Sequence, residues 1–291
     1  MPPTRAAEPN PQGDKWVGSR DSSVGVGTLG CTTVGRGYSS GDVPLYDESH
    51  DRSESGRCPL LLIHGGGSTI ESNWGRLIPE LSRSRPVWAV ELQGHGRTAP
   101  SHRTQSFEAS ADDVARLLDE IDVGAVDVLG FSNGGQVAMQ LARAQTGHRA
   151  ASYRRLGPFR RDGMIDGFWE GLETASFEDM PAVYRSADLQ VSGDPAHARS
   201  MFELDKQLML SFTDWRDAIP ALITAQTLVV AGDRDVITPQ HAVRLAATIP
   251  DDLLLIVPGT HGSYLGELAA AGNDLLPMRA TLPFLTEFLD A

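Results

Sequence analysis

The chain has 291 residues, 41% of them hydrophobic, which is enough to bury one large core or two modest ones. Its formal net charge of −13 would repel a phosphate-rich partner, which argues against nucleic-acid binding. No apolar run approaches the ~18 residues of a membrane-spanning helix, and Met1–Ser23 lacks the apolar segment of a signal peptide. We therefore expect a cytoplasmic protein without a membrane partner, in which Cys31 and Cys58 are free thiols.

The first part of the chain has little periodicity. Residues 1–42 are rich in Gly, Ser, Thr and Pro, which predicts a poorly ordered leader with one weak strand near Val24–Thr33. A short edge strand is expected at Val43–Tyr46, because Pro44 cannot donate a hydrogen bond in the centre of a sheet.

From residue 59 onward, apolar runs alternate with helical patterns. Continuous apolar runs predict strands buried on both faces, and apolar residues three or four apart predict amphipathic helices. The predicted strands are Pro59–Ile63, Pro86–Leu92, Val126–Leu129, Thr227–Ala231 and Leu253–Val257. The predicted helices are Trp74–Leu81, Ala109–Ile121, Gln136–Ala144 and one that starts at Pro239 behind the N-cap Thr238. The alternation predicts an α/β fold with a mostly parallel central sheet flanked by helices.

Two segments depart from this alternation. Residues 160–220 keep aromatic and aliphatic residues but contain no strand-like run, which predicts an inserted helical cap over the mouth of the sheet. Most of these apolar side chains are expected to form the cap's own core. Gln145–Gly157 is polar and basic where a buried strand is expected, so we predict a very short strand or a frayed sheet edge of low stability. The core is then formed by residues 43–159 and 221–291.

Ser132 is the strongest candidate for a reactive residue. It lies in Gly130-Phe131-Ser132-Asn133-Gly134, between an apolar strand and a helix. Such a turn strains the serine backbone, tolerates no bulk at the flanking positions and leaves the hydroxyl clear of the sheet. The five-residue pattern is common by chance, but its position between a strand and a helix favours a serine hydrolase.

Motifs on both sides of Ser132 extend the pattern. They are His64-Gly65-Gly66-Gly67, Gly94-His95-Gly96-Arg97, Gly130-Phe131-Ser132-Asn133-Gly134-Gly135, Gly232-Asp233-Arg234-Asp235 and Pro258-Gly259-Thr260-His261-Gly262. In this order, from about Leu60 to the C-terminus, the chain resembles the α/β-hydrolase superfamily. The resemblance implies the α/β-hydrolase fold, with a nucleophile, an acid and a base that follow one another in that order along the chain.

A serine hydroxyl attacks only when a base takes its proton, and a carboxylate usually orients that base. By the superfamily order, the base is His241 or His261. His241 falls in the first turn of a helix, where a surface position is expected, whereas His261 follows a strand at the sheet edge where such folds place catalysis. We therefore assign His261 as the base. The resemblance favours Asp235 as the acid, with Asp233 as the alternative that would otherwise brace the turn through backbone N–H groups.

An acyl-transfer site also needs two donors for the oxyanion. One is expected from the N–H of Asn133, at the start of the helix after the nucleophile. By resemblance the second is the N–H of Gly66, with Gly65 or Gly67 as alternatives, because glycines let the backbone approach the substrate. His95 is expected to be structural, its ring bonding to loop backbone.

Other chemistries find no support in the motifs. No Cys or His spacing suggests a metal site, and no phosphate-binding or dinucleotide fingerprint follows a strand, so we expect no metal and no cofactor. The predicted function is the hydrolysis of small or medium carboxylic esters, or of lactones, through an acyl-enzyme, with a small-molecule ester as substrate. The alternatives are a carbon–carbon bond hydrolase, for which Arg160 and Arg161 could hold a dienone carboxylate, and a weakly catalytic receptor.

Overall fold

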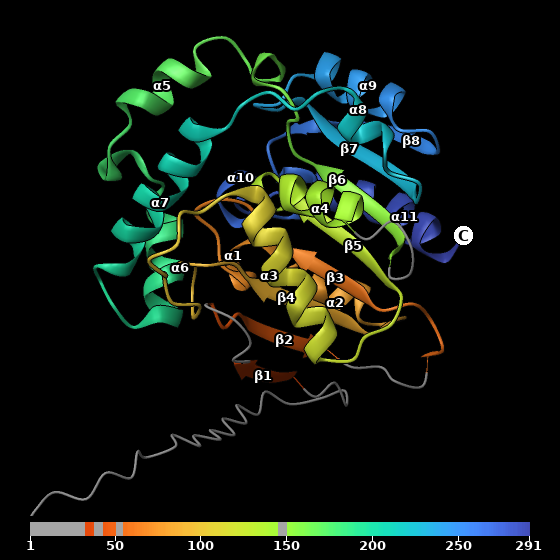
Figure 1. Ribbon diagram of the computed structural model, residues 1–291, viewed down its shortest axis with the longest axis horizontal. Coiled ribbons are helices and arrows are strands. Elements are labelled where there is room, and N and C mark those ends of the chain that lie inside the picture. The colour runs from red at the N-terminus through yellow and green to blue at the C-terminus, as the bar shows by residue number, and fades with distance from the viewer. Residues whose placement is uncertain (1–32, 38–42, 51–54, 145–149) are drawn as a thin grey trace, which may run out of the picture.

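The computed structural model describes residues 33–37, 43–50, 55–144 and 150–291 (Figure 1). The expected leader therefore lies almost wholly outside the described residues, as does Cys31. Cys58 is described, and its Sγ donates to the carbonyl oxygen of Ala125 at 3.3 Å. Among the described residues, no helix is both long enough and apolar enough to cross a membrane.

One sheet of eight strands organises the chain, in the order β1-β2-β4-β3-β5-β6-β7-β8. β1 and β2 are antiparallel to their neighbours, and all other pairs are parallel, which confirms the predicted mostly parallel sheet. The strands are β1 (Thr33–Gly37), β2 (Tyr46–His50), β3 (Leu60–Ile63), β4 (Val87–Glu91), β5 (Val126–Phe131), β6 (Ala150–Leu156), β7 (Gln226–Arg234) and β8 (Asp252–Thr260).

Helices cover both faces of the sheet. In Figure 1, α3 and α4 lie in front of the strands and α11 lies behind them. The helices of the core are α1 (Ile70–Trp74), α2 (Ile78–Leu81), α3 (Phe107–Glu120), α4 (Asn133–Ala144), α8 (Ala218–Ala221), α9 (Pro239–Thr248), α10 (Leu268–Ala271) and α11 (Leu276–Asp290). β3 and β5 are buried along their whole length, so they form the centre of the core, as their apolar runs predicted.

Three further helices, which we call the cap helices, lie between β6 and β7 in sequence and together at one side of the sheet (Figure 1). They are α5 (Phe168–Thr174), α6 (Ala182–Ser192) and α7 (His197–Ser211). α6 contacts α1 and α10. α1 follows the loop after β3, and α10 follows the loop after β8.

Three sequence predictions about elements are wrong. The edge strand at Val43–Tyr46 is instead β2, which starts at Tyr46 and has β1 outside it. The single helix predicted at Trp74–Leu81 is interrupted: α1 ends at Trp74 and α2 starts at Ile78, because Pro79 has no N–H to continue the helical hydrogen-bond ladder. β6 is neither very short nor at an edge: it has seven residues and pairs with both β5 and β7. Main-chain hydrogen bonds to β5 and β7 hold β6 in the sheet, although its sequence has no apolar run.

The expected surface position of His241 is also wrong. The side chain is 4% exposed and its ring packs against Phe159, with centroids 4.7 Å apart. Its Nε2 accepts a hydrogen bond from Phe159 N at 3.2 Å, so the ring is neutral. A Cβ on Gly163 would overlap this ring, and only a glycine there lets the chain pass so close to His241.

Burial lowers the pKa of His241 to about 4, against 6.5 in the unfolded chain. Below pH 6.5 the unfolded state takes up a proton that the folded state refuses, so stability is lost as the pH falls from 6.5 towards 4. We expect His241→Gln to be less stable than wild type at pH 7.5. The difference should shrink by up to about 1.4 kcal/mol per pH unit below pH 6.5. Urea unfolding of both proteins at pH 7.5, 6.0 and 5.0 measures it, and a constant difference would contradict the assignment of a neutral buried ring.

Candidate active site

Ser132 joins β5 to α4 in a strained turn. Its backbone φ is +52°, one of two positive values among the described non-glycine residues. A Cβ on Gly130 would overlap the Gly134 carbonyl, and a Cβ on Gly134 would overlap the Ile63 and His64 carbonyls. The glycines on either side of Ser132 are thus required by the close approach of strand, turn and helix.

His261 follows β8 directly and is oriented by Asp235. Nδ1 of His261 donates to Asp235 Oδ1 at 2.6 Å, which leaves the lone pair of the neutral ring on Nε2. The ring packs on Phe131, the residue before Ser132, with centroids 4.5 Å apart. No hydrogen bond joins the described Ser132 hydroxyl and His261 ring in this structure, and such contacts often tighten only when substrate binds.

Asp235 is 4% exposed and accepts from more than the histidine. Tyr264 Oη donates to its Oδ2 at 3.0 Å, and Ile237 N donates to its Oδ1 at 3.1 Å. Burial alone would raise the pKa of Asp235, but the nearby His261 and these donors outweigh burial and hold the pKa below its ordinary value. The carboxylate therefore stays charged beside the ring. The sequence reading missed Tyr264, although it lies three residues after His261.

Asp233, the alternative acid, points elsewhere. Its Oδ1 accepts from Gly259 N at 2.7 Å, which ties the end of β7 to β8. The side chain is half exposed, and its other partner is the neighbouring Arg234. Asp233 thus accepts from a backbone N–H group, as the sequence analysis predicted for Asp233 when Asp235 is the acid.

The three N–H groups of the glycine loop, Gly65–Gly67 after β3, differ in their hydrogen-bond partners. Gly65 N donates to Asn73 Oδ1 at 2.8 Å, and Gly67 N donates to Asp205 Oδ2 at 2.6 Å. Among the described residues, no acceptor engages Gly66 N. The loop lies against the Ser132 turn, since a Cβ on Gly65 would be 3.1 Å from Ser132 Cβ. Asn133 opens α4, so its N–H has no acceptor within the helix.

Two buried histidines flank this loop. His64 Nδ1 donates to Gly65 O at 2.7 Å and its Nε2 accepts from Leu92 N at 3.0 Å, so it is neutral, and burial lowers its pKa to about 3. His95 Nδ1 donates to Gln93 O at 3.0 Å, the backbone bond expected for a structural histidine.

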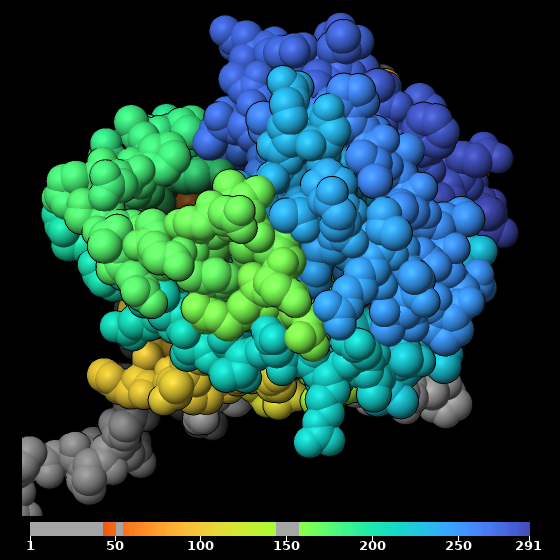
Figure 2. Space-filling model, turned by 90° about the horizontal axis from the view of Figure 1, so that it is seen from above, coloured from red at the N-terminus to blue at the C-terminus, as the bar shows by residue number. Residues whose placement is uncertain are grey.

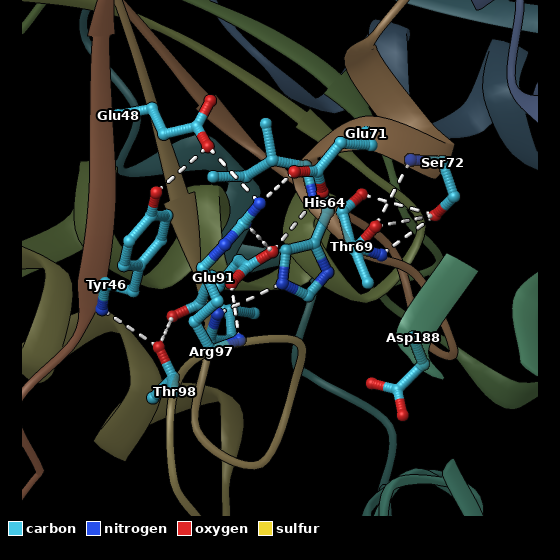
Figure 3. Close-up of polar contacts among 12 residues, drawn as sticks. Tyr46, Glu48, His64, Thr69, Glu71, Ser72, Glu91, Arg97, Thr98 and Asp188 are labelled. Atoms are coloured by element: carbon cyan, nitrogen blue, oxygen red, sulfur yellow. Dashed lines mark hydrogen bonds and ion pairs between the residues drawn. The ribbon is translucent and has the colours of Figure 1, made fainter. Parts of the chain in front are cut away.

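A network of charges around Glu91 holds the His95 loop (Figure 3). Glu91 ends β4, is fully buried, and accepts from Arg97 N at 2.6 Å and from Arg97 Nη1 at 3.0 Å. Arg97 also pairs with Glu71 and lies 4.5 Å above the Tyr46 ring. Glu91 further accepts from Ile70 N at 3.3 Å, which joins this loop to the helix that follows the glycine loop.

The segment between β6 and β7 covers these loops. The space-filling view shows a hollow among the green cap residues, with orange atoms from the part of the chain around β3 at its bottom (Figure 2). A Cβ on Gly67 would contact Met180 and Tyr184, and one on Gly94 would overlap Leu204. Met180 and the helices α6 and α7 therefore lie against these loops.

Arg160 and Arg161, the candidates for holding a carboxylate, are engaged with protein groups. Arg160 lies 3.3 Å from Asp214 and 3.4 Å from Asp162. Arg161 stacks 3.6 Å above the Trp169 ring and donates to the Phe212 carbonyl at 3.1 Å.

Comparison with known proteins gives matches along most of the chain. A model described as an alpha/beta hydrolase family matches residues 60–271. The dihydrolipoyllysine-residue acetyltransferase component of the acetoin cleaving system of Pseudomonas putida is 28% identical over 222 residues, which is 70% of this chain and 58% of that protein. The pimeloyl-acyl-carrier-protein methyl ester esterase of Neisseria meningitidis serogroup C is 36% identical over 127 residues, or 44% of this chain and 47% of that protein. The chain thus spans about half the length of these curated relatives.

A solved structure shows the same fold. The 2-hydroxy-6-oxo-6-phenylhexa-2,4-dienoate hydrolase from Rhodococcus sp. strain RHA1 superposes with a TM-score of 0.71 at 18% identity, over 90% of this chain and 100% of that chain. The superposition confirms the predicted fold class: a mostly parallel sheet flanked by helices, with a helical insertion.

Proposed function

The chain belongs to the alpha/beta hydrolase family, and we propose that it is a serine hydrolase that cleaves small or medium carboxylic esters, lactones included. The observation that carries the proposal is the joint position of three groups. Ser132 occupies a strained turn, His261 is held by Asp235 against Phe131, and the unengaged Gly66 N–H lies on the adjoining loop.

In the proposed reaction, Ser132 Oγ attacks the ester carbonyl carbon and passes its proton to His261 Nε2. The carbonyl oxygen becomes an oxyanion that accepts hydrogen bonds from the N–H groups of Gly66 and Asn133. Collapse of this intermediate breaks the ester C–O bond, and the departing alcohol takes the proton from His261. Water, deprotonated by His261, then attacks the acyl-serine. The bond between the acyl carbon and Ser132 Oγ breaks, Oγ takes the proton back from His261, and the acid is released. Asp235 stays ionised throughout and stabilises the transient imidazolium.

The charges near Ser132 favour a neutral substrate over a dienoate, which carries a carboxylate. Glu267, which is 1% exposed, packs against Gly262 beside His261. Both arginines that could have offset an anionic substrate are engaged elsewhere. A substrate carboxylate in this site would lie near the Glu267 carboxyl, and neither arginine would offset its charge, which disfavours binding. This charge distribution is the reason for ranking ester hydrolysis above carbon–carbon hydrolysis.

The test is a comparison of substrates on the wild-type protein. We expect hydrolysis of p-nitrophenyl esters with short or medium acyl chains, and kcat/KM at least about tenfold above that for a 2-hydroxy-6-oxo-dienoate. A fluorophosphonate should add one phosphonyl group to the peptide that contains Ser132, measured by mass spectrometry. Faster cleavage of the dienoate would favour the carbon–carbon hydrolase. Tight binding of a ligand without turnover of either substrate would favour a receptor.

A further inference from the structure

A carboxylate from the cap reaches the candidate oxyanion hole. Asp205 lies on α7, and its Oδ2 accepts from Gly67 N at 2.6 Å and from His95 Nε2 at 3.0 Å. Its Oδ1 accepts from Asn133 Nδ2 at 3.3 Å. One side chain of the cap therefore contacts the glycine loop, the His95 loop and the first residue of α4.

The pairing with His95 is ionic. Both ring nitrogens of His95 face acceptors, Gln93 O and Asp205 Oδ2, and a histidine that donates from both nitrogens carries a positive charge. The ring is 2% exposed, and burial alone would lower its pKa, but the Asp205 carboxylate reverses this and raises it. The pair is thus neutral as a whole. This neutrality matters because an uncompensated carboxylate beside an oxyanion would oppose its formation.

The contacts of Asp205 also explain which glycine is left to donate. By taking up the Gly67 N–H, Asp205 removes that group from competition, while the Gly66 N–H keeps no acceptor among the described residues. The Asn133 amide, held by Asp205, packs over Gly66: a Cβ there would be 2.7 Å from Asn133 Nδ2 and 3.2 Å from Asp205 Oδ2. The loop is confined between the two side chains.

We propose that Asp205, neutralised by His95, is a positioning residue that aligns the Gly66 and Asn133 donors, so that the cap helix α7 completes the oxyanion hole. The proposal rests on the proposed esterase function. It makes α7 part of the catalytic arrangement, in addition to any part that the cap has in covering the substrate.

The test uses Asp205→Asn and Asp205→Ala in the full-length chain. Asparagine keeps the size but has one oxygen, so it cannot accept from both Gly67 and Asn133, and it leaves His95 without a counter-charge. We expect kcat to fall about tenfold for Asn and about 100-fold for Ala, with KM within about threefold of wild type, because misplaced donors weaken transition-state binding. If the alanine variant does not fold, the asparagine variant carries the test.

A second readout separates positioning from general damage. A trifluoromethyl ketone forms a covalent adduct with the serine, and the adduct carries an oxyanion. A matched methyl ketone binds without forming this covalent bond and has no oxyanion. In the Asp205 variants the affinity for the trifluoromethyl ketone should fall in parallel with kcat/KM, and the affinity for the methyl ketone should stay unchanged. Equal losses for both ketones would overturn the proposal, as would a kcat within about threefold of wild type.

Asp188 supplies the matched control. It is a fully buried carboxylate of the same cap, on α6, and it accepts from His197 Nδ1 of α7 at 2.8 Å. Asp188→Asn breaks an aspartate–histidine pair without touching the glycine loop, so it should lower the melting temperature and leave kcat within about threefold. A loss of kcat equal to that of Asp205→Asn would refute the positioning role. A wild-type protein without esterase activity and without phosphonate labelling would refute the proposed function instead.

Discussion

Replacing Ser132 with alanine is expected to reduce kcat/KM for p-nitrophenyl ester hydrolysis by about 10⁴-fold or more, because the remaining groups have no nucleophile to activate. Alanine has the same Cβ as serine at the strained position, where φ is +52°, so the turn should be unchanged. The measurement is initial rate against substrate concentration, together with circular dichroism and thermal unfolding of both proteins.

Ser132→Gly is the matched control for this prediction. Glycine removes the same hydroxyl but adopts a positive φ without steric cost, so this variant should be equally inactive and more stable than Ser132→Ala by up to about 1 kcal/mol. Fluorophosphonate should label neither variant. Esterase activity retained in the alanine variant, within about tenfold of wild type, would exclude Ser132 as the nucleophile.

The parts of the fold that were predictable from sequence are those in which the residues of the segment itself determine its structure. β3 and β5 are buried on both faces, as their continuous apolar runs predict. The Ser132 turn was predictable because steric overlap allows only glycine at Gly130 and Gly134. Because this steric restriction acts on residues next to Ser132, it appears in the sequence as a short pattern of glycines around the serine.

β6 and the split helix show where local signals fail. β6 runs between β5 and β7, whose main-chain groups pair with it along both sides, and its seven residues do not repeat the apolar run of its neighbours. The helix predicted at Trp74–Leu81 spans the end of α1, a turn and α2, and Pro79, which has no N–H, lies in the first turn of α2. In both cases hydrogen bonding of the main chain, which composition does not report, defined the element.

The candidate site divides in the same way. His261 and Asp235 follow strands whose carboxyl ends meet at one edge of the sheet, so their proximity could be anticipated from the order of elements. Asp205 could not be anticipated, because it lies 138 residues after Gly67 and their contact depends on how α7 packs against the glycine loop. His241 was misplaced for a related reason: it is covered by Phe159 from a distant segment.

Asp235→Asn is expected to lower kcat by about 10⁴-fold while the protein stays folded. With its oxygen in the place of Oδ2, the asparagine still accepts from Tyr264 Oη, and its NH2 group takes the place of Oδ1, the acceptor of both Ile237 N and His261 Nδ1. An amide N–H that faces His261 Nδ1 favours the tautomer with the proton on Nε2. A ring in that tautomer cannot take the proton of Ser132. KM should change little, because Asp235 does not contact the substrate in the proposed reaction, and steady-state kinetics with thermal unfolding measures both effects.

Asp233→Asn is the natural comparison, since the two aspartates are two residues apart and Asp235 is the one that contacts His261. The asparagine side chain of this variant would keep an oxygen that can accept from Gly259 N, so kcat should remain within about threefold of wild type. The two variants make the same chemical change at the end of β7, which removes the effect of net charge from the comparison. If Asp233→Asn were the inactive variant and Asp235→Asn the active one, the acid would be Asp233 and the contact between Asp235 and His261 would be structural.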